Sequence, residues 1–530
     1  MAEGRAWHEA ASPVVRCPAG AFRGAAENGL RIFRGIRYAM PPAGDSRWTP
    51  PRPVPAPRGV ADATRFGPAC PQPTRRRGSI YAGPMAATGE DCLNLNVWAP
   101  ADAQDAPVFV WIHGGSLIWG ANSEPFYDCA ALARRGLVAV SINYRLGVFG
   151  YLAHPELSAE SPDGVSGNYG LLDQIAALEW VRDNIAGFGG DPGNVTIAGE
   201  SAGALSVLCL MCAPGARGLF AKAVAQSGYA ISMPELKRER FGEEAAEAAG
   251  ARLAAAVGAE TVADLRARDA AELAAAAAKA GFLPSGAVDG RLLRRQIVET
   301  FERGEQAPVP LLAGFNSGEI RSLRFLAPAM PESAESYEAA IRARYGELAD
   351  DFLRLYPADE MEESILAAIR DALYGWTAER LAAGQAQLGA PVFLYLFDHG
   401  YPAATEAGLH GFHASEIPYV FGTLDRTPPR WPAIPAAAGE RALSEAMADY
   451  WTSFAATGTP VSAGWPEWRP NAPDGFWMRF GEGPEPSGNP YPGAYEFHED
   501  VIRRRRADGG TPWNWNVGIA APPLAAAVAG

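Results

Sequence analysis

The chain has 530 residues, of which 48% are hydrophobic and 20% charged, and its formal net charge is -14. These values are typical of a globular protein that is large enough to bury an extensive core. The acidic balance, interrupted only by short arginine clusters at 75–77 and 503–506, argues against nucleic acid as a partner. The sequence contains no run of about 18 apolar residues, so we expect no membrane span.

The first residues of the chain lack a basic start followed by an apolar core, so we predict no secretion signal and a cytoplasmic protein. Six cysteines in a chain of this length do not form a disulfide scaffold. Cys209 and Cys212 have Cys-x-x-Cys spacing, but no second ligand pair accompanies them, and we expect burial instead. Residues 518–530, rich in Ala and Pro, are predicted to form a frayed tail. The sequence does not predict the oligomeric state.

The first half of the chain alternates between strand and helix patterns. Four segments read as strands: 30–39, 94–98, 107–112 and 137–144. The third is almost wholly apolar, which is typical of an interior strand that is covered on both faces. Residues 173–184 then carry apolar side chains at helical spacing, and a glycine-rich loop leads into a further strand. This alternation predicts an α/β fold with a mostly parallel central sheet and helices on both faces.

That further strand ends in Gly199-Glu200-Ser201-Ala202-Gly203, and a helical run of small and apolar residues follows it. A strand, a tight Gly-x-Ser-x-Gly turn and a helix are the context of a nucleophile elbow, in which the serine hydroxyl projects from the turn. The glycines let the turn close without side-chain clashes. The pattern also occurs by chance, and the alternative is an ordinary strand-to-helix turn. Ser201 is therefore a candidate nucleophile.

The strand at 107–112 runs directly into His113-Gly114-Gly115-Ser116. Glycines at such a turn free backbone N–H groups to point into a cavity, where they can stabilise an oxyanion. The alternative is a plain glycine turn. The position of this turn, after a buried strand and upstream of the serine, favours an oxyanion hole.

The second half of the chain is rich in helix patterns and returns twice to strands. Residues 308–314 and 391–397 are predicted strands, and a closing helix is expected around 447–457. We expect one α/β domain that spans 1–530, with peripheral helical insertions at about 235–305 and 330–385. No linker clearly separates independent domains.

A serine hydroxyl needs a neighbouring base and an acid that orients it. Three histidines follow closely after the strand at 391–397, whereas His498 lies near the terminus. Spacing alone favours the two loop residues, His410 and His413, equally over His399. Glu319 follows one late strand and Asp398 the next, and both precede the loop histidines. From spacing alone, either carboxylate could be the acid of the triad. The alternative for each is that it is an ordinary solvent-exposed side chain in a loop.

Several ordered motifs then point to a known family. They are Phe33-Arg34-Gly35-Ile36-Arg37-Tyr38-Ala39, Glu90-Asp91-Cys92-Leu93-Asn94-Leu95-Asn96-Val97, Asn143-Tyr144-Arg145, Phe188-Gly189-Gly190-Asp191-Pro192, the Ser201 motif and Gln226-Ser227-Gly228. With them the chain resembles the type-B carboxylesterases of the α/β-hydrolase fold, which include bacterial para-nitrobenzyl esterases and animal cholinesterases. The similarity extends from about residue 33 to residue 468.

The resemblance implies which candidates form the site. The family pattern places its acid in Gly-x-Asn-x-x-Glu, at Glu319, and its base in His-x-x-Glu-Ile, at His413. It also implies that the oxyanion hole consists of the backbone N–H groups of Gly115, Ser116 and Ala202. No metal or cofactor is implied. Cys70 and Cys92 match a pair that is disulfide-bonded in secreted relatives, but a reducing cytoplasm would leave it open.

Three positions depart from the family pattern. Ser116 stands where glycine or alanine is common, and Leu117 where phenylalanine is common, so both are expected to change the walls of the substrate pocket. Arg37 stands where the family usually has proline, and we expect this change to affect only the local loop conformation.

The expected activity is hydrolysis of small carboxylic esters through an acyl-enzyme intermediate. A carbamate or amide hydrolase would use the same triad, and a lipase would need an exposed apolar surface or lid. A non-catalytic adhesion protein on this fold would be expected to lose triad residues and to carry a signal peptide and a membrane span.

Overall fold

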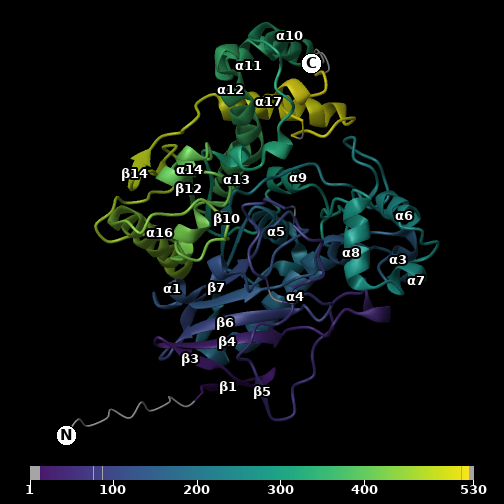
Figure 1. The fold of residues 1–530 in the computed structure, drawn as a ribbon, viewed down its shortest axis with the longest axis vertical. Coiled ribbons are helices and arrows are strands. Elements are labelled where there is room, and N and C mark those ends of the chain that lie inside the picture. Colours follow the sequence, from purple (N-terminus) through teal and green to yellow (C-terminus); the bar gives the residue numbers. More distant parts are fainter. Residues whose placement is uncertain (1–11, 76, 86, 515, 525–530) are drawn as a thin grey trace.

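The computed structural model describes residues 12–75, 77–85, 87–514 and 516–524. Its centre is a sheet of eleven strands (Figure 1). In spatial order these are β14 (Pro484–Ser487), β13 (Trp477–Phe480), β12 (Val392–Phe397), β11 (Leu311–Asn316), β10 (Lys222–Gln226), β9 (Gly190–Glu200), β7 (Ala106–Ile112), β8 (Val138–Ile142), β6 (Asn94–Pro100), β4 (Leu30–Arg37) and β3 (Ala25–Glu27).

The middle of this sheet is parallel. From β8 through β7, β9, β10, β11 and β12 to β13 every neighbouring pair runs parallel, and antiparallel pairs occur only at the two margins. The carboxyl ends of these parallel strands therefore lie at one edge of the sheet, where open α/β folds place their sites. The predicted α/β-hydrolase architecture is confirmed.

Helices cover both faces, which explains the uninterrupted apolar strands. In β7, Val108, Val110 and Ile112 pack into a core cluster with α4 (Tyr169–Asn184) and α5 (Ala202–Cys212). The alternate residues Phe109 and Trp111 pack into a second cluster with α15 (Ile417–Phe421) and α16 (Ala438–Thr457). Because strand side chains alternate between faces, both sets must be apolar.

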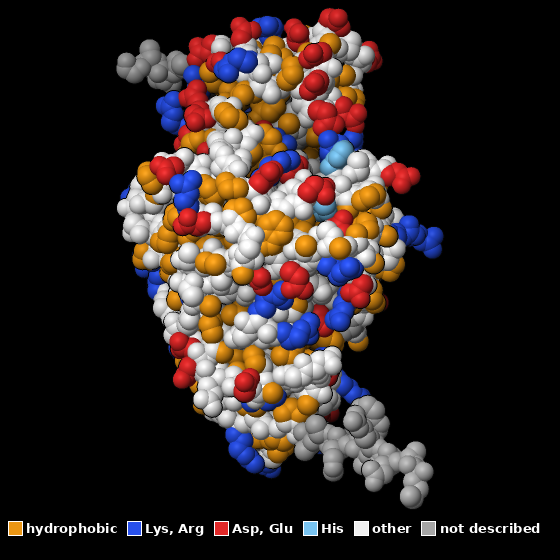
Figure 2. Space-filling model, turned by 90° about the vertical axis from the view of Figure 1, so that its left-hand side faces the viewer, with side chains coloured by type: hydrophobic (Ala, Val, Ile, Leu, Met, Phe, Trp, Pro, Cys, Tyr) orange, Lys and Arg blue, Asp and Glu red, His pale blue; other side chains and the backbone are white. Residues whose placement is uncertain are grey.

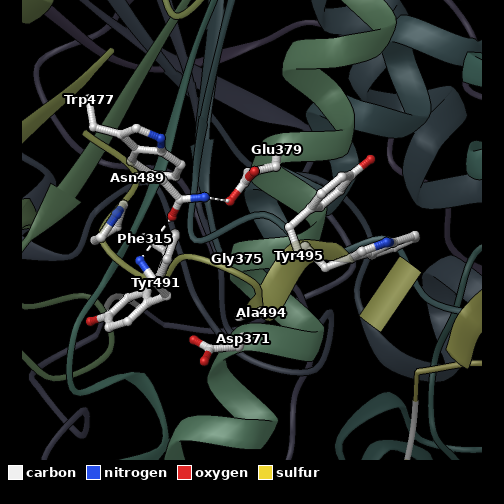
Figure 3. A pocket seen from close by; sticks show the side chains of 11 residues that line it. Phe315, Asp371, Gly375, Glu379, Trp477, Asn489, Tyr491, Ala494 and Tyr495 are labelled. Atoms are coloured by element: carbon white, nitrogen blue, oxygen red, sulfur yellow. Dashed lines mark hydrogen bonds between the residues drawn. The ribbon is translucent and has the colours of Figure 1, made fainter. Parts of the chain in front are cut away.

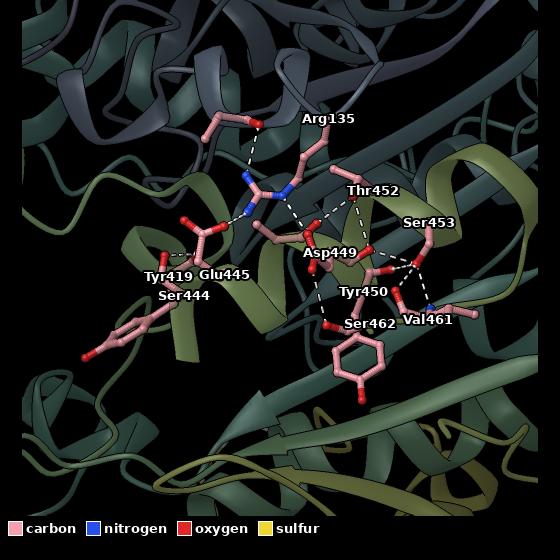
Figure 4. A network of polar contacts seen from close by, with 12 residues as sticks. Arg135, Tyr419, Ser444, Glu445, Asp449, Tyr450, Thr452, Ser453, Val461 and Ser462 are labelled. Carbon is pink, nitrogen blue, oxygen red and sulfur yellow. Dashed lines mark hydrogen bonds and ion pairs between the residues drawn. The ribbon is translucent and has the colours of Figure 1, made fainter. Parts of the chain in front are cut away.

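A polar network fastens α16 at the edge of this second cluster (Figure 4). Arg135, just after α1 (Ala130–Ala133), donates from Nε to Oδ1 of Asp449 at 2.8 Å and also pairs with Glu445. The other oxygen of Asp449 accepts a hydrogen bond from Ser462 at 3.3 Å. These contacts are on the surface, so they orient α16 more than they stabilise the fold.

Two groups of helices branch from the sheet at the stretches where insertions are expected. The first comprises α6 (Ala246–Ala256), α7 (Val262–Arg266), α8 (Ala270–Lys279) and α9 (Ile297–Glu302). The second comprises α10 (Ala334–Tyr345), α11 (Ala349–Leu355), α12 (Met361–Arg370) and α13 (Trp376–Gln387), the last two joined by a π-helical turn at Asp371–Gly375. The remaining elements are β1 (Val14–Cys17), β2 (Gly20–Arg23), β5 (Val60–Asp62), α2 (Gly147–Tyr151), α3 (Pro155–Glu160), α14 (Pro402–Glu406) and α17 (Ala494–Asp508).

Acidic side chains gather at one end of the molecule. In Figure 2 they are dense at the top, the end at which α10, α11 and α12 lie in Figure 1, whereas the rest of this face mixes both charges. Within the described ranges, no helix is both long and apolar enough to cross a membrane.

The structure adds two strands that the sequence analysis did not predict and corrects one expectation. β13 and β14 follow residues 391–397; both are short, and β14, at the edge of the sheet, contains prolines, so they give little periodic signal. The predicted frayed tail is wrong for its first part. Residues 518–520 form a 3-10 turn, Ala521 is buried, and the N–H of Leu524 donates to the carbonyl of Arg344 at 2.7 Å. Residues 525–530 lie outside the described part of the chain.

Candidate active site

Ser201 occupies the turn between β9 and α5 in a strained conformation. Its φ is 56° and its ψ is -120°, values that a non-glycine residue rarely adopts. Its N–H donates to the carbonyl of Gln226, at the end of β10, at 2.9 Å. At Gly203 an added Cβ would lie 2.1 Å from the carbonyl oxygen of Ile112. The motif glycine therefore lets α5 begin directly against β7, which is the geometry of a nucleophile elbow.

The glycine turn after β7 lies against this elbow. A Cβ added at Gly114 would lie 3.3 Å from Cβ of Ser201. Gly115 and Ser116 continue the turn with φ values of 106° and 57°. Among the described residues, no acceptor takes the N–H of Gly115, Ser116 or Ala202. Ser116 itself is exposed to solvent.

Glu319 and His413 are in contact beneath the surface. Their exposed fractions are 0% and 5%, and Nδ1 of His413 shares a short hydrogen bond with Oε2 of Glu319. The other carboxylate oxygen of Glu319 accepts from the N–H of Asn316 at 2.9 Å. The N–H of Gly318 donates to the carbonyl of Gly411 at 2.7 Å, which joins the two loops. The structure thus brings the predicted acid and base together.

The second ring nitrogen of His413 faces the elbow. Nε2 lies 3.0 Å from Oε1 of Glu200, the residue before Ser201. That oxygen has no hydrogen-bond partner among the described residues, so Nε2 lies close to it without a well-aligned hydrogen bond. The Ser201 hydroxyl also makes no hydrogen bond within the described structure. In free enzymes the bond between nucleophile and base is often formed only once substrate is bound.

The charges of this cluster shift the titration of both Glu200 and His413. Burial disfavours the carboxylate and raises the pKa of Glu200 to about 8, against the opposing effect of the His413 cation. Burial lowers the pKa of His413, but the carboxylates of Glu200 and Glu319 more than compensate and raise it to about 9. His413 is therefore held as a strong base beside the serine turn.

A third buried carboxylate, Glu416, joins the loops of the site. Its two oxygens accept from Nε2 of Gln226 at 2.8 Å and from Nδ2 of Asn316 at 2.6 Å. The carbonyl of Gln226 in turn binds the N–H of Ser201, and the N–H of Asn316 binds Glu319. Glu416 also follows His413 by three residues in the chain. It is therefore linked to the Ser201 turn through Gln226, to Glu319 through Asn316, and to His413 through the backbone.

The other candidates lie elsewhere. His410 is exposed, and Asp398 pairs with Arg479 at 2.6 Å. His399 is buried but bonds from Nε2 to Oε2 of Glu440 at 2.9 Å. Of the candidates that spacing left open, the structure thus brings His413 and Glu319 into contact, whereas His410 and Asp398 lie elsewhere.

The structure also places the residues that depart from the family pattern. Leu117 is buried, with 3% of its surface exposed. Arg37 is on the surface and bonds from Nε to Oδ1 of Asp91 at 2.8 Å, so its effect is local. Cys70 and Cys92 are both buried free thiols, and the neighbouring Cys70 side chain, together with burial, raises the pKa of Cys92.

A separate pocket beside β11 and α13 does not have the chemistry for nucleophilic catalysis (Figure 3). Aromatic side chains line it, among them Phe315, Trp477 and Tyr491, and it contains no serine, cysteine or histidine. Two of its polar side chains bind each other: Nδ2 of Asn489 donates to Oε1 of Glu379 at 2.9 Å.

Comparisons with known proteins agree with this arrangement. The profile described as "Carboxylesterase family" matches residues 11–497. The chain belongs to the carboxylesterase family. Fumonisin B1 esterase of Sphingopyxis macrogoltabida is 37% identical to it, over 86% of this chain and 84% of the relative. Para-nitrobenzyl esterase of Bacillus subtilis is 36% identical, over 86% and 92%.

Solved structures extend the likeness to the fold. A thermophilic para-nitrobenzyl esterase superposes on this carboxylesterase with a TM-score of 0.78 and 33% identity, covering 91% of this chain and 99% of that one. A carboxylesterase of Geobacillus stearothermophilus gives 0.77 and 33%, covering 95% and 99%. The protein is thus a serine carboxylesterase, and small-molecule esters are its substrate class.

Proposed function

We propose that Ser201, His413 and Glu319 are the catalytic triad of this carboxylesterase. The observation that carries the proposal is the buried pair of His413 and Glu319, whose free ring nitrogen faces the strained turn that presents Ser201. Glu319 binds Nδ1, which fixes the tautomer and leaves Nε2 for the serine proton. Of the histidines near the end of β12, only His413 lies in this position.

In the proposed reaction, Nε2 of His413 accepts the Ser201 proton while the hydroxyl oxygen attacks the ester carbonyl. The backbone N–H groups of Gly115, Ser116 and Ala202 bind the oxyanion, and each would be worth on the order of 3 kcal/mol in the transition state. Protonated His413 then gives its proton to the leaving alcohol. Water activated by the same nitrogen releases the acid and restores Ser201.

The assignment supports small carboxylic esters as substrates. The solvent exposure of Ser116 supports access of a substrate to this turn. The mechanism uses only side chains and backbone of this chain, and we propose no cofactor. A cytoplasmic location and the absence of nucleic-acid and membrane partners remain proposals that rest on sequence composition.

Replacement of the nucleophile tests the proposal. Ser201→Ala is expected to lower kcat for a para-nitrophenyl ester by at least about 10⁴-fold, because only oxyanion binding would remain. A fluorophosphonate should label the Ser201 peptide of the wild type, as read by mass spectrometry, and not the variant.

Ser227 offers a matched control. It directly follows the neighbouring strand β10 with a similar φ of 49°, but it is fully buried. Ser227→Ala should keep kcat within about tenfold of the wild type, since its hydroxyl takes no part in the proposed step. Near-normal turnover by Ser201→Ala would refute the assignment.

A further inference from the structure

A π-helical turn joins α12 to α13 beside the strand that leads to the proposed acid. It comprises Asp371–Gly375, and its first four residues are buried. Such turns are rare in proteins, and they occur frequently at functional sites. The last residue of the turn packs on β11, because a Cβ added at Gly375 would lie 3.4 Å from the ring of Phe315. The turn is therefore adjacent to the strand that ends three residues before Glu319.

Hydrogen bonds fasten this turn to the loop of the proposed acid. Nη1 of Arg370, the last residue of α12, donates to the carbonyl of Ser317 at 3.1 Å, two residues before Glu319. Nε of Arg370 donates to Oδ1 of Asp371 at 2.7 Å, and the other oxygen of Asp371 accepts from the hydroxyl of Tyr356 at 3.0 Å. The side chains of Arg370 and Asp371 are largely buried, so these charge-assisted bonds fix the turn relative to the acid.

The fourth residue of the turn, Tyr374, packs against the imidazole of His413. The two ring centroids are 5.7 Å apart, and the ring planes are inclined by 41°. Tyr374 is 3% exposed, and the ring of Tyr229 meets it edge-on with centroids 6.1 Å apart. Among the described aromatic side chains, Tyr374 alone is in ring contact with His413. A buried and firmly held ring thus borders the imidazole.

We infer that Tyr374 is a positioning residue for His413, an inference that rests on the proposed triad. The carbonyl of His413 accepts from the hydroxyl of Tyr81 at 3.0 Å, and its Nδ1 binds Glu319. Rotation of a histidine ring about χ2 has a broad energy minimum, so one hydrogen bond at Nδ1 still lets the ring tilt. Tyr374 blocks that movement and keeps Nε2 facing the Ser201 turn. A displacement of about 1 Å at such a position can lower the rate about 10²-fold.

Steady-state kinetics of two replacements test the inference. Tyr374→Leu keeps an apolar side chain but removes the ring. It should lower kcat by about 10–100-fold for para-nitrophenyl acetate and para-nitrophenyl butyrate alike, with KM changed by less than about threefold. Tyr374→Phe keeps the ring and should retain kcat within about threefold. A residue that only lines the substrate pocket would change KM, or would change the two esters unequally. Normal kcat in Tyr374→Leu, or a loss that depends on the acyl chain, would overturn the inference.

Tyr419 supplies the matched control. Its ring centroid lies 5.6 Å from that of His399, which is outside the proposed triad. Tyr419→Leu should keep kcat for both esters within about threefold. Equal losses in the two leucine variants would show a general packing effect and would also overturn the inference.

Two further measurements keep the result unambiguous. Circular dichroism and urea unfolding show whether each variant is folded. If Tyr374→Leu is not, Tyr374→Met, which is unbranched, replaces it with the same expectations. Ser201→Ala separates the two proposals: an active Ser201→Ala would remove the triad itself. An inactive Ser201→Ala together with a normal Tyr374→Leu would keep the triad and remove only the role of Tyr374.

Discussion

The molecule contains two buried pairs of histidine and glutamate that look alike and differ in use. His413 pairs with Glu319, and His399 pairs with Glu440. Both imidazoles are 5% exposed, and both follow β12 in the sequence. A search for buried histidine–carboxylate contacts would return both.

The ring nitrogen that remains free distinguishes the pairs. His413 binds its glutamate through Nδ1, which leaves Nε2 beside Glu200 and the Ser201 turn. His399 binds through Nε2, and its Nδ1 is buried without a hydrogen bond among the described residues. The hydroxyl of Tyr419 also donates to Glu440 at 2.6 Å, so that carboxylate links α15 and α16. The contrast teaches that the orientation of a histidine, more than its partner, marks it as a candidate base.

Replacing the two histidines should give the largest difference. His413→Gln is expected to lower kcat/KM for a para-nitrophenyl ester by about 10⁴-fold or more, because no group remains to accept the serine proton. His399→Gln should keep kcat/KM within about tenfold and lower the free energy of unfolding by about 1–3 kcal/mol. Initial rates and urea unfolding measure both. Equal losses of activity in the two variants would contradict the different roles given to His413 and His399.

The two glutamates provide the next comparison. Glu319→Gln should lower kcat by about 10²–10⁴-fold, since an amide no longer stabilises the protonated imidazole. Glu440→Gln is expected to leave kcat almost unchanged. Circular dichroism should show that both variants are folded. A Glu319→Gln variant with normal kcat would exclude this carboxylate as the acid.

Replacement of Glu200 should change the pH dependence of kcat/KM more than the maximal rate. The neutral form of His413 is the base, and its pKa is raised to about 9, against burial, by Glu200 and Glu319. kcat/KM should therefore increase with pH towards about 9. Glu200→Gln removes one of the carboxylates that favour the cation, so the midpoint of this rise should move to lower pH by about one unit.

The test is a pH profile of kcat/KM for both proteins, corrected for spontaneous hydrolysis. An unchanged midpoint in Glu200→Gln would show that Glu200 does not act on His413. Glu440→Gln is the control here, because Glu440 belongs to the other pair and its loss should not move the midpoint.

Of the substitutions considered, replacement of Tyr419 should have the smallest effect. Tyr419→Phe removes the hydrogen bond to the buried Glu440 and is expected to lower the free energy of unfolding by about 1–2 kcal/mol, without changing kcat. Urea denaturation and steady-state rates measure this. A change in kcat similar to that of Glu319→Gln would mean that the second pair is coupled to the reaction.

The sequence predicted the parts of the fold that carry strong local signals. The apolar strand at 107–112 and the Gly-x-Ser-x-Gly turn were both found where they were expected. β10 was not predicted, because Lys222–Gln226 is short and contains small residues. Its neighbours β9 and β11 define it through tertiary pairing, which no local pattern contains.

For the site, spacing predicted that an acid and a base follow the serine in the chain. It left two candidates for the acid, Glu319 and Asp398, and two for the base, His410 and His413. The choice depends on contacts between loops, such as the hydrogen bond from Gly318 to Gly411, that bring Glu319 to His413. The roles of Glu200 and Glu416 were missed. Both stand within the motifs quoted for the family, but only the structure shows that Glu200 is buried beside the imidazole and that Glu416 is buried between Gln226 and Asn316.

The exposure of Ser116 at the glycine turn has a consequence for directed evolution. In the proposed site this residue contributes its backbone N–H, which every amino acid except proline supplies, while its exposed side chain borders the substrate. Its φ of 57° favours glycine, asparagine and aspartate as replacements. A library at position 116 would therefore vary substrate preference while the oxyanion donor is retained in nearly every member. Ser201 has no such tolerance, because its role resides in the side chain.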